Sequence, residues 1–139
     1  MENQARHANE ALIHHYYATF NAGDREAMLG LLTDAVVHDI NQGESEVGSE
    51  VFRLFLQRMD RAYHEQVEDL VVLSDATGSR AAAEFYIRGK YLQTDEGLPT
   101  ATGQTYHLRV GAFFEINKGK IHRVTNYYNL QDWLKQVGA

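Results

Sequence analysis

A phenol and a carboxylate near the N-terminus each lie in a largely apolar segment. Tyr16 lies in the stretch HHYYATFNAGD, and Asp39 ends the stretch LLTDAVVHD. Apolar surroundings desolvate a carboxylate and raise its pKa toward the range in which it can move protons. A tyrosine on the core side of a helix brings a hydrogen-bond donor into the same interior, although Tyr17 beside it competes for this role. The pair predicts an acid–base pocket with Asp39 as the base.

A third polar residue, Asn126, lies in the segment VTNYYN near the C-terminus. Side chains alternate between the two faces of a strand, so Asn126 shares a face with Val124 and Tyr128, which we expect to be the core face. A buried amide must be hydrogen-bonded, and we expect Asn126 to orient Asp39 or to bind an oxygen of a substrate. A β-bulge that turns the amide outward is the alternative.

The histidines offer further proton carriers, but their positions favour other roles. His38 directly precedes Asp39, so the two side chains point to opposite faces of a strand, and we assign His38 a structural or interface role. His107 and Arg109 fall on the non-core face of a predicted strand, which indicates a surface or subunit contact. The chain has no HxH or HExxH motif, no cysteine and no glycine-rich phosphate loop, so we predict neither a metal site nor a cofactor.

The composition indicates one globular domain. The chain has 139 residues, of which 44% are hydrophobic and 23% charged, as is typical of a single folded domain over residues 1–139. The net charge of −6 and the scattered lysines and arginines argue against nucleic acid as a partner. No signal-like segment is present, and no apolar run approaches the ~20 residues that span a bilayer. We therefore expect a soluble, cytoplasmic protein without a membrane partner.

Helical spacing of apolar residues dominates the first half of the chain. Gly23 suits the end of the first helix, and Asp24 is the expected N-cap of the second. The predicted order is a helix over residues 3–21, a short helix after Asp24, a strand over 34–40, a loop over 41–46 and a third helix that begins at Gly48-Ser49.

The second half alternates with the period of strands. The predicted strands cover about residues 65–74, 80–93, 104–116 and 120–129, and a short helix with Trp133 and Leu134 follows. One face of the two long central strands is apolar. The opposite face mixes charged and aromatic residues, which indicates a homodimer interface through the outer face of the sheet. Its members are Glu84, Tyr86, Arg88, His107 and Arg109.

Helices followed by a run of strands are typical of an α+β domain. We expect the three N-terminal helices to cover one face of a strongly curved, mostly antiparallel sheet. Such a sheet wraps round the helices as a cone-shaped barrel, and its open end is a natural pocket.

The order of these elements, with the segments NAGD, DAVVHD and GKIHRVTNYYNLQDW, resembles the ketosteroid isomerase-related proteins. These proteins form part of the SnoaL-like group within the cystatin-like, nuclear transport factor 2-like fold. The resemblance implies that Asp39 occupies the position of the base and Tyr16 that of the oxyanion tyrosine. The second oxyanion acid of that family would fall at Ala112, where no carboxylate is present, and Glu115 has the opposite strand parity.

The resemblance implies a proton-transfer isomerase, steroid delta-isomerase-like or polyketide cyclase-like, that acts on a small apolar carbonyl compound. Asp39 would move a proton α to the carbonyl, while Tyr16 with Asn126 or Tyr128 would hydrogen-bond the enolate oxygen. A non-catalytic small-molecule-binding domain, favoured by Ala112, and a hydratase or epoxide hydrolase are the alternatives. The predicted lining of the substrate pocket is Tyr128, Tyr106, Ala112, Phe114, Phe55 and Met59.

Overall fold

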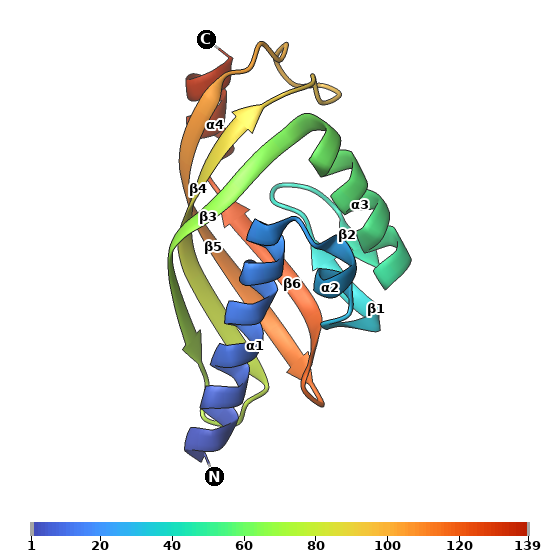
Figure 1. Ribbon diagram of the computed structural model, residues 1–139, viewed down its shortest axis with the longest axis vertical. Helices are drawn as coiled ribbons and strands as arrows, with labels where there is room; N and C mark the ends of the chain where they lie inside the picture. The colour runs from blue at the N-terminus through green and yellow to red at the C-terminus, as the bar shows by residue number, and fades with distance from the viewer. Residues whose placement is uncertain (1, 139) are drawn as a thin grey trace.

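Helix α1 opens the described part of the chain, which comprises residues 2–138 of a computed structural model (Figure 1). Gly23 ends this helix with a φ of +71°, which glycine adopts without strain. Asp24 then caps α2 by accepting a hydrogen bond from the backbone N–H of Ala27. Both features confirm the sequence prediction. The helices are α1 (Glu2–Ala22), α2 (Arg25–Leu29), α3 (Ser49–Ala62) and α4 (Leu130–Val137).

The strands form one curved sheet, which is not closed into a barrel, in the order β2-β1-β6-β5-β4-β3. β1 pairs with β6 in parallel, and every other neighbouring pair is antiparallel. The α+β prediction is confirmed. The predicted loop over 41–46, however, includes the first residues of the short edge strand β2, which the prediction lacks. The strands are β1 (Leu32–Asp39), β2 (Ser45–Val47), β3 (Tyr63–Ser74), β4 (Arg80–Tyr91), β5 (Thr105–Asn117) and β6 (Lys120–Tyr128).

The helices enclose an interior against the concave face of the sheet. Helix α1 packs against β3 and β4, while α3 packs against β1 and β2 (Figure 1). At one end of the sheet, Trp133 of α4 lies edge-on against Tyr91 and Tyr106. No helix within residues 2–138 is long and apolar enough to cross a membrane.

The predicted alternation of the two long strands is confirmed. In β4 and β5 the inward residues are buried, and the outward residues are half-buried or exposed. On the outer face Arg109 binds Glu84 at 3.0 Å, and the rings of Tyr86 and His107 stack with centroids 4.8 Å apart. His107 and Arg109 therefore lie on the non-core face, as expected from their parity.

Candidate active site

An interior cavity of about 270 Å³ lies between the helices and the concave face of the sheet. Ligand pockets commonly measure ~300–1,000 Å³, so this cavity suits a small compound with one or two rings. The exposed residues Arg58 and Asp60 of α3 contribute to its lining, which places its opening beside the C-terminal half of that helix. Much of its wall is apolar and includes Phe52, Phe55, Leu56, Met59, Phe85 and Leu108.

His38 brings an imidazole to this cavity from β1. The side chain is only 2% exposed, and its ring lies against Phe52 and Phe55 at centroid distances of 4.6 and 4.5 Å. Its Nδ1 is buried and has no hydrogen-bond partner among the described residues. Burial lowers the pKa of His38 to about 4, and the neighbouring charge of Asp39 opposes this effect only in part. The ring is therefore neutral near pH 7 and can accept a proton.

Tyr16 and Tyr17 bring two phenols to the same cavity from α1. Both side chains are buried, and their rings meet edge to face with centroids 5.1 Å apart. The hydroxyl of Tyr17 has no hydrogen-bond partner among the residues that the structure describes. Burial raises the pKa of each phenol well above its ordinary value of 10. Both groups are therefore neutral donors at physiological pH.

A carboxyl group reaches the cavity from β3, where Glu65 is part of the lining. Tyr106 of β5 donates a hydrogen bond to Oε2 of Glu65 at 2.5 Å. Burial raises the pKa of Glu65, while the hydrogen bond from Tyr106 and the charge of Arg25 oppose that rise. No motif in the sequence points to this residue, because the contact joins strands that are not adjacent in the sheet.

Asn126 and Tyr128 line the cavity from β6, on the face that their alternation predicts. The backbone N–H of Tyr128 donates to the side-chain oxygen of Asn41 at 3.2 Å, and burial raises the pKa of the Tyr128 phenol. Asn126 makes no hydrogen bond to Asp39. Asn126 also contributes to the wall of the hollow beside Asp39, and contact of its amide with a ligand oxygen stays a prediction.

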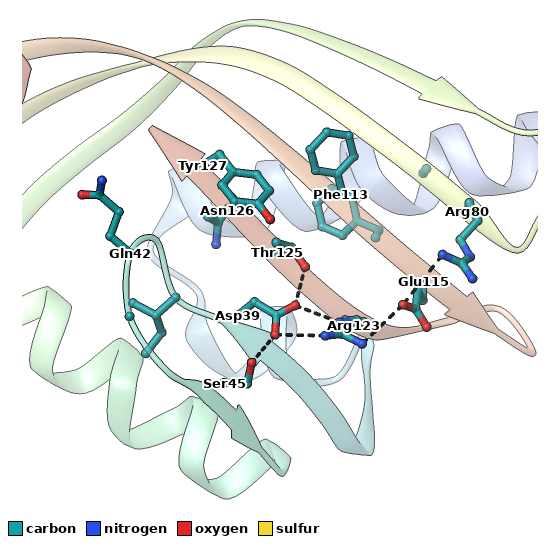
Figure 2. A pocket seen from close by; sticks show the side chains of 14 residues that line it. Asp39, Gln42, Ser45, Arg80, Phe113, Glu115, Arg123, Thr125, Asn126 and Tyr127 are labelled. Carbon is teal, nitrogen blue, oxygen red and sulfur yellow. Dashed lines mark hydrogen bonds and ion pairs between the residues drawn. The ribbon is translucent and has the colours of Figure 1, made fainter. Parts of the chain in front are cut away.

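Asp39 does not face this cavity, and the prediction that it does is wrong. Its carboxylate lies on the outer face of the sheet, where the side chains of Arg123, Thr125 and Ser45 surround it (Figure 2). Nε and Nη2 of Arg123 donate to the carboxylate at 2.7 and 3.2 Å, and the hydroxyls of Thr125 and Ser45 each donate at 2.5 Å. Asp39 and Tyr16 therefore belong to different sides of the sheet.

These contacts make Asp39 a poor base. The hydrogen bond from Arg123 is the largest of the effects that hold the pKa of Asp39 well below its ordinary value of 3.8. Glu115 and Arg80 extend the network over an open hollow of about 770 Å³, with Nη1 of Arg123 3.7 Å and Nη1 of Arg80 3.8 Å from Oε2 of Glu115 (Figure 2). We interpret this group of ion pairs as a structural feature of the outer face.

The sequence of β1 does not by itself decide whether His38 or Asp39 faces the interior. Val36 and Val37 are adjacent, so an apolar residue falls on both faces of β1. The structure buries Val36, and His38 follows it on the same face two residues later. The expectation that His38 points away from the interior is therefore wrong. Its alternation with Val36 was the signal that could have found it.

The other predicted pocket residues divide into two groups. Phe55 and Met59 of α3 line the cavity, as expected. Tyr106, Ala112 and Phe114 face the interior but lie in the packed core outside the lining. Inward parity places a residue in the interior without deciding whether a helix covers it. Tyr106 is linked to the cavity by its hydrogen bond to Glu65, and Phe114 also contributes to the outer hollow beside Asp39.

A model of the SnoaL-like domain family matches residues 13–124 of this chain. The chain is 59% identical to a candidate polyketide cyclase from Pseudomonas putida KT2440, with a TM-score of 0.90 over 91% of this chain and 96% of that one. It is 51% identical to a candidate polyketide cyclase from Xanthomonas campestris pv. campestris, with a TM-score of 0.94 over 96% and 99%.

A candidate ketosteroid isomerase from Kribbella flavida is 23% identical, with a TM-score of 0.66 over 89% of this chain and 79% of that one, and shares the fold. No curated protein matches the chain.

Proposed function

The chain belongs to the family of SnoaL-like domains, and we propose that it is a proton-transfer enzyme of the isomerase or cyclase type. Its substrate would be a small, largely apolar carbonyl compound bound in the interior cavity. His38 would serve as the base in place of Asp39, and Tyr16 would hydrogen-bond the carbonyl oxygen. Tyr17 and Asn126 are further donors in the same cavity.

The observation that carries this proposal is the unpaired imidazole of His38. Native proteins rarely bury a polar atom without a hydrogen-bond partner, because its lost hydration costs about 1–3 kcal/mol. Nδ1 of His38 is such an atom, next to a cavity that is otherwise mostly apolar. A ligand that approaches the ring is the partner that would justify this cost.

The reaction would begin with removal of a proton from the carbon next to the carbonyl. His38 takes that proton, the C–H electron pair forms a C=C bond, and the carbonyl oxygen becomes an enolate. The neutral phenol of Tyr16 stabilises this oxygen by donating a hydrogen bond. Cyclisation of a polyketide also begins with an enolate of this kind, so the step is compatible with the relatives named as candidate polyketide cyclases.

The exchange of α-protons in D₂O tests this step without knowledge of the natural substrate. The probes are cyclohexanone, 1-indanone and 2-tetralone, which have one or two rings, and proton NMR follows the loss of their α-proton signals. We expect exchange above the protein-free rate for the wild type, and a loss of about 10²–10⁴-fold in His38→Phe, the usual contribution of a general base.

Asp39→Asn is the matched control, because it removes the adjacent carboxylate on the other side of the sheet. We expect this variant to keep most of the exchange activity. If His38→Phe retains full activity while Asp39→Asn loses it, the assignment of the base is wrong. If the ketones bind without any exchange, the chain is a binding domain and not an enzyme.

A further inference from the structure

Glu65 is an ionisable group of the cavity that the proton transfer from carbon does not use. It lines the same cavity as His38, but the two residues come from opposite halves of the sheet order. A carboxyl group in a mostly apolar cavity carries a desolvation cost, which hydrogen bonds from its surroundings can offset.

The surroundings of Glu65 are built across three strands. Glu65 of β3 pairs with Gly89 of β4, which in turn pairs with Tyr106 of β5. A Cβ atom at position 89 would overlap the ring of Tyr106. The absence of a side chain at Gly89 therefore lets that ring cross β4 and deliver its hydroxyl to Oε2 of Glu65 at 2.5 Å.

The hydrogen bond leaves one carboxyl oxygen available. Oε2 of Glu65 accepts from Tyr106, while Oε1 has no hydrogen-bond partner among the described residues. Burial is the largest effect on the pKa of Glu65 and raises it, which makes protonation of the carboxyl group easier than in water. When the group is protonated, the proton resides on Oε1, because the phenol already occupies Oε2 as a donor.

We propose that Glu65 is the acid of this site, and that its Oε1–H donates to the oxygen of the carbonyl compound whose α-proton His38 removes. This inference rests on the proposed function. It also identifies a carboxylic acid in the cavity although position 112, where the resemblance places one, is alanine. The ligand it selects is a compound whose oxygen can reach Glu65 while its α-carbon lies beside His38.

Removal of the proton from carbon and donation of a proton to oxygen are coupled in this step. The C–H electron pair becomes the C=C bond of the enol, and the carbonyl π pair moves to oxygen and takes the proton of Oε1. His38 then carries one additional proton, and Glu65 is a carboxylate that Tyr106 stabilises. Return of a proton from His38 to the same or another carbon, and of the enol proton to Glu65, completes an isomerisation or an exchange.

Infrared difference spectroscopy of bound 2-tetralone, labelled with ¹³C at the carbonyl, tests the donor role directly. A hydrogen bond to the carbonyl lowers its stretching frequency, and this signal does not require proton abstraction. We expect the band to move to lower frequency in the wild type and in Glu65→Gln, whose amide still donates. In Glu65→Leu, which keeps the volume and lacks a donor, we expect a clearly smaller displacement, because Tyr16 is then the remaining donor to the carbonyl oxygen.

Glu68→Gln is the matched control, because Glu68 lies on the same strand but binds Arg88 on the outer face at 3.0 Å. An unchanged band displacement in Glu65→Leu, or no displacement in the wild type, would overturn the inference. Should Glu65→Leu not fold, Tyr106→Phe replaces it. Because Tyr106→Phe removes the phenol from Oε2 of Glu65, it should change the carbonyl band of bound 2-tetralone and shift the pH dependence of α-proton exchange. If neither the band nor the pH profile changes, the proposal is also overturned.

The two proposals fail separately in these experiments. A smaller infrared displacement in Glu65→Leu, together with absence of exchange in the wild type, would leave Glu65 as a ligand-binding donor and refute the enzyme. Exchange that depends on His38 but not on Glu65, with an unchanged infrared band, would leave the enzyme and refute the role of Glu65.

Discussion

Replacement of His38 by phenylalanine should make the protein more stable while it removes the proposed base. Phenylalanine preserves a flat ring between Phe52 and Phe55, whose centroids lie 4.6 and 4.5 Å from that of His38. It also removes Nδ1, which is buried without a partner among the described residues. Relief of an unsatisfied buried polar atom is worth about 1–3 kcal/mol, so we expect the free energy of unfolding at pH 7 to rise by about that amount.

The gain in stability of His38→Phe over the wild type should increase as the pH falls, by an amount that the pKa of His38 determines. That pKa is lowered from 6.5 to about 4 in the folded protein, so the unfolded chain binds the proton first as the pH falls. The wild type therefore loses stability between about pH 6.5 and pH 4, and the loss approaches about 3 kcal/mol below pH 4. We expect the gap between variant and wild type to be about 2.5 kcal/mol wider at about pH 4.5 than at about pH 8.

Urea unfolding at a series of pH values, followed by the fluorescence of Trp133 at one fixed protein concentration, measures this gap. His14→Phe is the control, because it makes the same replacement on the exposed side of α1, and it should lie within about 0.5 kcal/mol of the wild type at pH 7. A His38→Phe variant that is less stable than the wild type at pH 7, or a gap that does not change with pH, would refute the burial of an unpaired imidazole.

Two further predictions concern the sheet. Gly89→Ala should lower the free energy of unfolding by about 1–3 kcal/mol, because the new methyl group overlaps the Tyr106 ring. A double-mutant cycle with Tyr106→Ala should show that most of this loss disappears when the ring is absent. If the effects of the two substitutions are additive, the contact between position 89 and the Tyr106 ring is contradicted. We also propose a homodimer through the outer face of the sheet, where Phe113 and Tyr127 are 53% and 58% exposed and their ring centroids lie 5.9 Å apart. Sedimentation should show a dimer of the wild type at micromolar concentration, and Phe113→Glu should weaken it. A wild type that sediments as a monomer would contradict the proposal.

The fold could be predicted because its signals are local and repeated. The long strands β4 and β5 alternate over many residues, so an error at one position does not change which face is apolar. The cap at Asp24 and the break at Gly23 are short-range backbone effects, and both are confirmed. β2 was missed because three residues in a polar segment carry almost no periodic signal, and only pairing with β1 makes them a strand.

The site was harder to predict because it depends on single residues. In β1 one position decides whether His38 or Asp39 faces the interior, and the adjacent valines leave that choice open. Arg123 and Thr125, which hold Asp39 outside, come from a strand more than eighty positions away. Glu65 was not predicted for the same reason. Its hydrogen-bond partner Tyr106, and Gly89, whose missing side chain leaves room for the Tyr106 ring, become its neighbours only in the folded sheet.

Ligands should bind beside His38 in the interior cavity and not beside Asp39 on the outer face. A crystal structure of the protein with bound 2-tetralone tests it most directly. We predict ring density inside the cavity, with the α-carbon next to the His38 ring and the carbonyl oxygen within hydrogen-bond distance of Tyr16 or Glu65. Density confined to the outer hollow, in contact with Asp39 and Arg123, would contradict binding in the interior cavity.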